Sequence, residues 1–244
     1  MSENLKGLCK RASYIGFFGS YARKSDYIEG LSDINVIAIS EDKSLLLELA
    51  SEGYSPIVLS KEQLRKLCDS GDPLCLYVTQ SESVCGEFPS EIKFVKTDYT
   101  CERLKKSILS LYIISLLAFF REDERSSLEN SFRTLRTLIQ WRACIENKPI
   151  PLSIEETERT CETLGLKFCQ TMKDLVLIRR MRAPLTLWSL DKVAEAIMDF
   201  MKVVKASKIY EETKGDVFKI EPVESGFVVE KTNKDKVLIP FSSL

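Results

Sequence analysis

Apolar and polar positions change their spacing along this chain, and the first part combines two kinds of pattern. Up to about residue 98, short apolar runs alternate with segments of helical spacing. The pattern predicts strands at residues 13–20, 33–40 and 54–60, and helices at residues 42–53 and 60–71. Residues 73–79 and a shorter segment near Val84 are expected to complete the sheet. Strands interleaved with helices predict a small α/β domain with a mixed sheet over residues 1–98.

Two local signals predict helix boundaries in this domain. Ser60 is followed three residues later by Gln63, which is the spacing of a capping box at a helix start. Gly53 follows a helical pattern and suits the left-handed position just after a helix.

After residue 98 the spacing is helical alone, and near the end it becomes alternating. Five helices are predicted, at residues 101–120, 127–147, 153–165, 166–182 and 189–207. Pro151 and Pro184 fall at breaks, because proline disfavours helix at the residue before it. The short connections predict an antiparallel helical bundle over residues 99–208. Alternation in residues 215–241 predicts two or three short β-strands within a C-terminal β-hairpin segment, residues 209–244, so the expected class is α+β.

Composition is that of an ordinary globular protein. The chain has 244 residues, 44% hydrophobic and 29% charged, and a formal net charge of −1. This charge argues against a protein built for non-specific nucleic-acid binding. The longest apolar run, residues 108–120, is shorter than the ~20 residues of a bilayer span, and the N-terminus shows no signal peptide. We therefore expect a soluble, cytoplasmic protein with no membrane partner.

Cysteine and histidine usage limits the possible chemistry. None of the 8 cysteines forms a CxxC pair, which argues against a structural zinc site. Most lie in apolar stretches, so we expect buried thiols, with disulfides as the alternative if the source is a hyperthermophile. The chain has no histidine, which excludes Ser-His-Asp and Cys-His catalysis and His-ligated metals.

A candidate phosphate and metal site lies at the end of the first strand. Gly19 has no Cβ, so a phosphate can approach its backbone, and a helix expected to begin there would present N–H groups to the anion. Ser20 can donate its hydroxyl to the same phosphate. Asp33 and Asn35 are expected on one face of the next strand, where they would hold a cation beside that phosphate.

A second group of charged residues has two interpretations. Arg179, Arg180 and Arg182 could bind a phosphate or nucleic acid, or they could simply be favourable near a helix C-terminus. We favour the structural interpretation.

The segment GSYARKSDYIEGLSDINV, residues 19–36, resembles the signature of the DNA-polymerase-β-like nucleotidyltransferases. It is most similar to their small prokaryotic branch, with its usual GSxARG followed by SDIDL. The resemblance implies that Gly19, Ser20 and Arg23 bind a nucleoside triphosphate. It also implies that Asp33 is catalytic and ligates Mg²⁺ or Mn²⁺, with Asn35 at a second metal position. The following helical domain would help to hold an acceptor, whose identity the resemblance does not specify.

The departures from this pattern concern the acids. Asn35 stands where the family has its second metal-binding carboxylate, and residues 54–60 offer no third acid. Removing one preorganised electrostatic contact typically costs ~10²–10³ in rate. We therefore expect a nucleotidyltransferase-fold protein, related to enzymes that transfer a nucleoside monophosphate from Mg-NTP, with weak or lost catalysis.

Three alternatives stay open at this point. Loop carboxylates could complete the metal shell, the candidates being Asp26, Glu29 and Asp72. The chain could instead be an inactive nucleotide-binding regulatory protein. The apolar richness of the helical segments also suits a homodimer or a partner subunit of an antitoxin-like pair.

Overall fold

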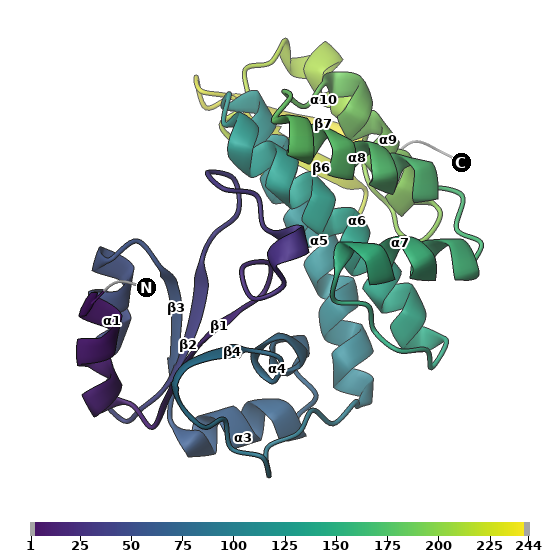
Figure 1. The fold of residues 1–244 in the computed structure, drawn as a ribbon. Coiled ribbons are helices and arrows are strands. Elements are labelled where there is room, and N and C mark those ends of the chain that lie inside the picture. The colour runs from purple at the N-terminus through teal and green to yellow at the C-terminus, as the bar shows by residue number, and fades with distance from the viewer. Residues whose placement is uncertain (1–2, 242–244) are drawn as a thin grey trace. The chain divides into compact units, whose positions relative to one another are not determined.

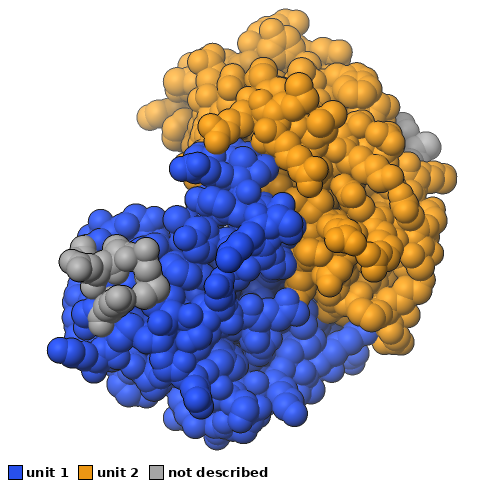
Figure 2. Space-filling model, viewed as in Figure 1, with its two compact units in different colours: residues 1–103 blue, residues 104–244 orange. Residues whose placement is uncertain are grey.

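The computed structural model describes residues 3–241 and divides into two compact units, Met1–Arg103 and Leu104–Leu244 (Figure 2). The first unit contains a mixed four-stranded sheet, and the second contains helices followed by a three-stranded antiparallel sheet (Figure 1). The predicted α+β class is confirmed.

The sheet of the first unit has the order β3-β2-β1-β4. Its strands are β1 (Tyr14–Phe18), β2 (Asn35–Ile39), β3 (Ser55–Leu59) and β4 (Glu82–Gly86). β1 is antiparallel to both β2 and β4, whereas β2 and β3 are parallel. The α-helices of this unit are α1 (Glu3–Leu8), α2 (Leu45–Ser51), α3 (Lys61–Asp69) and α4 (Pro73–Val78). Two 3₁₀ turns, η1 (Cys9–Arg11) and η2 (Lys24–Asp26), flank β1.

Alternate strand positions bury two different faces of this sheet. On one face, Tyr14, Ile37 and Ile39 pack against side chains of α3 and α4 such as Leu64 and Val78. The opposite face is also covered: its buried residues are Ile15, Val36 and Ala38 from the sheet, Leu5 from α1, and Leu45 and Leu49 from α2. Period-two alternation with both faces apolar explains why the short runs of the sequence predict these strands.

The two predicted helix boundaries are confirmed. The Ser60 hydroxyl accepts the Gln63 N–H at 3.1 Å, and the Gln63 side chain accepts the Ser60 N–H at 2.9 Å. Gly53 follows α2 with a φ of 85°.

The predicted strand at residues 73–79 is wrong, because this segment is helix α4. The Asp72 carboxylate accepts the Leu74 N–H at 2.9 Å, and Pro73 occupies the first turn, where its missing N–H costs nothing. Cys75 and Val78, one turn apart, both point into the core. The shorter segment near Val84 does form the predicted strand, β4.

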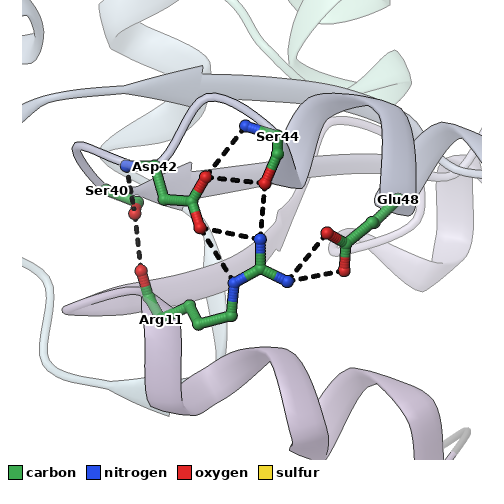
Figure 3. A network of polar contacts seen from close by, with 5 residues as sticks. All are labelled: Arg11, Ser40, Asp42, Ser44 and Glu48. Atoms are coloured by element: carbon green, nitrogen blue, oxygen red, sulfur yellow. Dashed lines mark hydrogen bonds and ion pairs between the residues drawn. The ribbon is translucent and has the colours of Figure 1, made fainter.

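A polar network ties η1 to the connection between β2 and α2 (Figure 3). The Arg11 guanidinium contacts Asp42 Oδ2 at 2.7 Å and both Glu48 carboxylate oxygens at 2.7 Å. The Ser40 hydroxyl donates to the Arg11 carbonyl oxygen at 2.5 Å. Hydrogen bonds from Ser44, and then from Arg11, lower the pKa of Asp42 from 3.8 to about 2. The network therefore ties η1 to the segment that follows β2, through exposed ion pairs and one buried hydroxyl, that of Ser40.

The prediction of buried thiols is also wrong. Disulfides join Cys9 to Cys85, Cys68 to Cys75 and Cys161 to Cys169, while Cys101 and Cys144 are disulfide-bonded as well. Within residues 3–241, no cysteine is a free thiol. An apolar neighbourhood predicts burial but not pairing, which depends on where the fold places two cysteines. The Cα atoms of Cys68 and Cys75, for example, lie 5.1 Å apart because α3 and α4 share one core.

The helices run from α5 to α10, and the five predicted ones are present as α5 to α9. Their bounds are α5 (Asp98–Phe120), α6 (Glu124–Ile145), α7 (Ile154–Thr163), α8 (Cys169–Met181), α9 (Leu187–Met198) and α10 (Ala206–Thr213). α6 packs against α7, α8 and α9. In the part of the chain that the structure describes, no helix combines the length and apolarity that a membrane crossing needs.

The predicted helix at residues 189–207 is too long. α9 ends at Met198, and α10 begins at Ala206. Between them, buried Val204 is not helical, and its carbonyl oxygen accepts the buried Tyr112 hydroxyl at 2.7 Å. A side-chain hydrogen bond from α5 therefore satisfies a carbonyl that a continuous helix would have used.

Arg179 has a structural role inside the second unit. Its Nε lies 2.6 Å from Glu129 Oε1, and its guanidinium carbon is 3.9 Å from the centre of the Phe132 ring. Its side chain is 3% exposed. This burial supports the structural interpretation for Arg179, whereas Arg180 and Arg182 are exposed.

The C-terminal strands confirm the alternating pattern. β5 (Lys219–Val223), β6 (Gly226–Glu230) and β7 (Lys236–Pro240) form an antiparallel sheet in sequence order. α10 packs against β7 and α9. The sheet therefore does not stand alone but is supported by helices of its own unit, as a sheet this small requires.

Candidate functional site

The loop after β1 begins with the predicted Gly19–Ser20 turn. Gly19 has a φ of 74°, which lies in the left-handed region that favours glycine. The Arg23 N–H donates to the Gly19 carbonyl at 3.4 Å, and the Asp26 N–H donates to the Arg23 carbonyl at 2.9 Å. Tyr21 packs against the rings of Phe17, at 4.7 Å, and Tyr27, at 5.0 Å.

The helix predicted to start at this turn is therefore wrong, because the chain forms turns and then η2. Arg23, with φ −95° and ψ 41°, leaves helical geometry before a second turn can form. Aromatic packing holds the loop in this compact shape. Residues 19–26 therefore lack the N–H groups of an α-helix start that were expected to attract an anion.

The turn meets the start of β2 at one end of the sheet. β1 and β2 pair Phe18 with Asn35, so Gly19 comes directly beside the Asn35 side chain. A Cβ atom on Gly19 would lie 3.2 Å from Asn35 Nδ2. Asn35 Nδ2 also donates to the Asp33 carbonyl oxygen at 3.5 Å. Asp33 and Asn35 are both half-buried, and Asp33 lies just before β2 rather than on it.

Ser20 offers a hydrogen-bonding group in this turn. The residue is half-exposed, and its hydroxyl has no hydrogen-bond partner among residues 3–241. A hydroxyl in this state is available to donate to an anion that approaches the Gly19 backbone.

Arg23 is held inside the loop by an acid. Its Nε donates to Asp26 Oδ2 at 3.0 Å, and the side chains of Arg23 and Asp26 are 16% and 5% exposed. Its guanidinium carbon lies 5.8 Å from the centre of the Tyr77 ring. Its Nη2 is buried and has no hydrogen-bond partner within the described chain. Arg23 therefore has one buried nitrogen without a partner, while Asp26 is its counter-ion.

Strand β3, the strand on which a third acid would be expected, lies beside β2. Their parallel register pairs Asn35 with Ser55 and Ile37 with Ile57. β3 carries no carboxylate at any position. Of the other loop acids considered above, Asp72 caps α4 and Glu29 is exposed.

These residues do not fit a centre of two cations. Within residues 3–241, no group of three or more His, Cys, Asp or Glu side chains is arranged to hold a metal ion. Asp33 supplies one carboxylate, and Asn35 supplies a neutral amide. One or two carboxylates together with substrate phosphates can still hold Mg²⁺, so the set fits at most one cation that arrives with a triphosphate.

Sequence reasoning missed two features of this site. The Arg23–Asp26 pair has a local signal, since opposite charges three residues apart can meet within one turn. The position of Tyr77 has no local sequence signal, because its place beside Arg23 depends on α4 and on the packing of distant segments.

No protein-family model matches this chain, and a comparison with curated proteins finds no match.

Proposed function

We propose that the unit Met1–Arg103 is a nucleotidyltransferase-like domain that binds a nucleoside triphosphate and in which catalysis is weak or lost. One observation carries the proposal. The left-handed Gly19 turn lies directly against Asn35, and Asp33 precedes Asn35 by two residues. A phosphate-binding turn and a cation-binding carboxylate therefore belong to one end of the β1–β2 pair.

The groups at this end suit a polyphosphate. The Gly19 backbone admits an oxygen at short range, the Ser20 hydroxyl can donate to it, and Arg23 Nη2 supplies a positively charged donor. Mg²⁺ or Mn²⁺, when bound, would be held by Asp33 and by oxygens of the triphosphate. The acceptor of the transferred group is not specified by these residues.

Weak catalysis follows from the number of acids. In nucleotidyl transfer the acceptor hydroxyl must lose a proton, and negative charge develops on the departing pyrophosphate. Asp33 cannot both hold a cation and accept that proton, and neither Asn35 nor β3 offers a second carboxylate. The chain therefore has groups that bind and orient a triphosphate, but it has too few to activate the acceptor.

The alternative is a nucleotide-binding regulatory or partner protein without any transfer activity. The same absence of an acid on β3 favours it. The two functions differ only in turnover, so binding and product release must be measured separately.

Calorimetric titration of each of the four NTPs, with and without Mg²⁺, tests the proposed binding. We expect Mg²⁺-dependent binding that Asp33→Asn weakens by about 10- to 100-fold, as loss of a charged contact does. Asp69→Asn is the matched control, because Asp69 is an exposed acid on α3 of the same unit. Asn35→Asp should strengthen Mg²⁺ binding by restoring one negative charge. Equal affinity with and without Mg²⁺, unchanged by Asp33→Asn, would refute the assignment.

A further inference from the structure

The second unit contains a cavity of about 430 Å³ that takes no part in the proposed nucleotide site. Its walls come from the end of α5, the connection to α6, the start of α6, the segment that precedes α9, and the end of α10 with the two residues that follow it. The lining residues are Phe119, Phe120, Glu122, Glu124, Ser127, Leu185, Tyr210, Lys214 and Gly215. A cavity of this size is within the range of small-molecule sites in proteins.

One part of the lining is apolar and aromatic. The rings of Phe119 and Phe120 meet edge to face with their centres 5.6 Å apart. Leu185 is buried, whereas Tyr210 is 47% exposed. The Tyr210 ring lies on Gly215, where a Cβ atom would approach its Cε2 to 3.3 Å. The absence of a side chain at Gly215 therefore sets where this aromatic wall can lie.

The other part of the lining carries three charges. Glu122 lies in the connection between α5 and α6, Glu124 is the first residue of α6, and Lys214 follows the last residue of α10. None of these three side chains has an ion-pair or hydrogen-bond partner among residues 3–241. Two acids and one base without partners at one cavity are chemically complementary to a ligand that carries both signs of charge.

The backbone at two of these residues is also unusual for the side chains it carries. Glu122 and Lys214 have φ values of 60° and 56°, in the left-handed region at a helix end, where glycine is the common residue. Long charged side chains therefore stand at positions where they are conformationally unfavourable. Strained residues of this kind often mark ligand sites.

We propose that this cavity binds a free α-amino acid with an apolar side chain. Its ammonium group would face Glu122 and Glu124, and its carboxylate would face Lys214. The apolar side chain would pack against Phe119, Phe120 and Tyr210. A ligand with only a positive charge would meet repulsion from Lys214, and one with only a negative charge would meet two carboxylates. The zwitterion is the class that satisfies all three charges, and its site is independent of the proposed nucleotide site.

Three probes of one shape separate these charge classes. L-phenylalanine carries both charges, phenethylamine carries only the ammonium, and 3-phenylpropionate carries only the carboxylate. In calorimetric titration of the full-length protein, we expect L-phenylalanine to bind at least about tenfold more tightly than either analogue. L-leucine should bind as well, because the wall is apolar rather than specific for one ring.

Variants of the charged residues give a readout that a folding defect cannot imitate. Lys214→Gln should weaken L-phenylalanine binding by about tenfold and at the same time strengthen phenethylamine binding, because the repulsion is removed. Glu122→Gln combined with Glu124→Gln should weaken L-phenylalanine and strengthen 3-phenylpropionate. Glu212→Gln and Lys234→Gln, both at exposed residues outside the lining, are the matched controls and should change neither.

Three results would overturn the proposal. The first is the absence of binding by both L-phenylalanine and L-leucine up to about 10 mM. The second is phenethylamine or 3-phenylpropionate binding as tightly as L-phenylalanine, and the third is unchanged binding in the charge variants.

Discussion

The disulfide between Cys9 and Cys85 should be a major source of stability in the first unit. It joins the end of the N-terminal segment to edge strand β4 across a sequence separation of 76 residues. Loop-closure entropy for a cross-link of that span corresponds to about 4.5 kcal/mol of stabilisation at room temperature. Both cysteines are only half-buried, so their replacement by alanine removes little core packing.

The cross-link predicts a specific relation between single and double variants. Breaking one end releases the loop completely, so Cys9→Ala, Cys85→Ala and the double variant should lose the same free energy, about 4–5 kcal/mol. Packing losses would instead add, and the double variant would then lose the sum of the two single changes.

The assay must report on the first unit by itself. Both tryptophans, Trp141 and Trp188, lie in the second unit, so tryptophan fluorescence would not report unfolding of the first. Amide hydrogen exchange of peptides from β1 and β2, without reductant, measures its opening equilibrium directly. We expect protection to fall by about three orders of magnitude in all three variants. Losses below about 1 kcal/mol, or losses that add, would refute the reasoning.

Three further predictions follow from named contacts. Asp42, with a pKa of about 2 against an ordinary 3.8, should stabilise the fold fully above pH 3.8 and lose this contribution as the pH falls through 2. NMR titration should show the pKa of Asp42 rising in Ser44→Ala and in Arg11→Gln, and an unchanged pKa in both variants would contradict the network. Arg179→Met should lower the free energy of unfolding by about 3–5 kcal/mol because it leaves Glu129 buried and unpaired, and adding Glu129→Leu should restore most of this loss. Urea unfolding followed by tryptophan fluorescence tests this, and a loss below about 1 kcal/mol in the single variant would argue against it. Gly19→Ala should destabilise the first unit by about 1–2 kcal/mol and weaken nucleotide binding. Gly53 has a φ of 85° and no atom within 4 Å of a new Cβ, so Gly53→Ala should show the effect of backbone strain alone. Equal nucleotide binding by the two variants would contradict the close contact between Gly19 and Asn35.

The elements that followed from local pattern were predicted well. β1, β2 and β3 have apolar runs bounded by turn residues, and the Ser60–Gln63 capping box marks the start of α3. The α4 segment was assigned wrongly because a short apolar run suits a strand and a buried helix equally well. Its Asp72–Pro73 start was the signal that could have decided the question.

Contacts between distant segments could not be predicted in this way. Pairing of Cys9 with Cys85 depends on β4 lying beside β1, and no spacing rule links the two cysteines. The same holds for Glu129 and Arg179, which meet because α6 packs against α8.

The candidate site was predictable in part. The approach of Gly19 to Asn35 follows from an antiparallel pair whose register places the end of β1 beside the start of β2. The turn alone could not show that an α-helix is absent after Gly19. Aromatic contacts of Tyr21 and the Arg23–Asp26 pair stabilise a compact loop there instead.

The most direct test of the proposed function measures nucleotide binding and turnover in the same sample. The protein is incubated with α-³²P-labelled NTP and Mg²⁺ or Mn²⁺, and bound nucleotide, released pyrophosphate and labelled acceptor are quantified together, with Asp33→Asn as the control. We expect metal-dependent binding that Asp33→Asn weakens, with little or no pyrophosphate release. Rapid pyrophosphate release abolished by Asp33→Asn would show that catalysis is intact, and absence of any nucleotide binding would contradict the proposed site altogether.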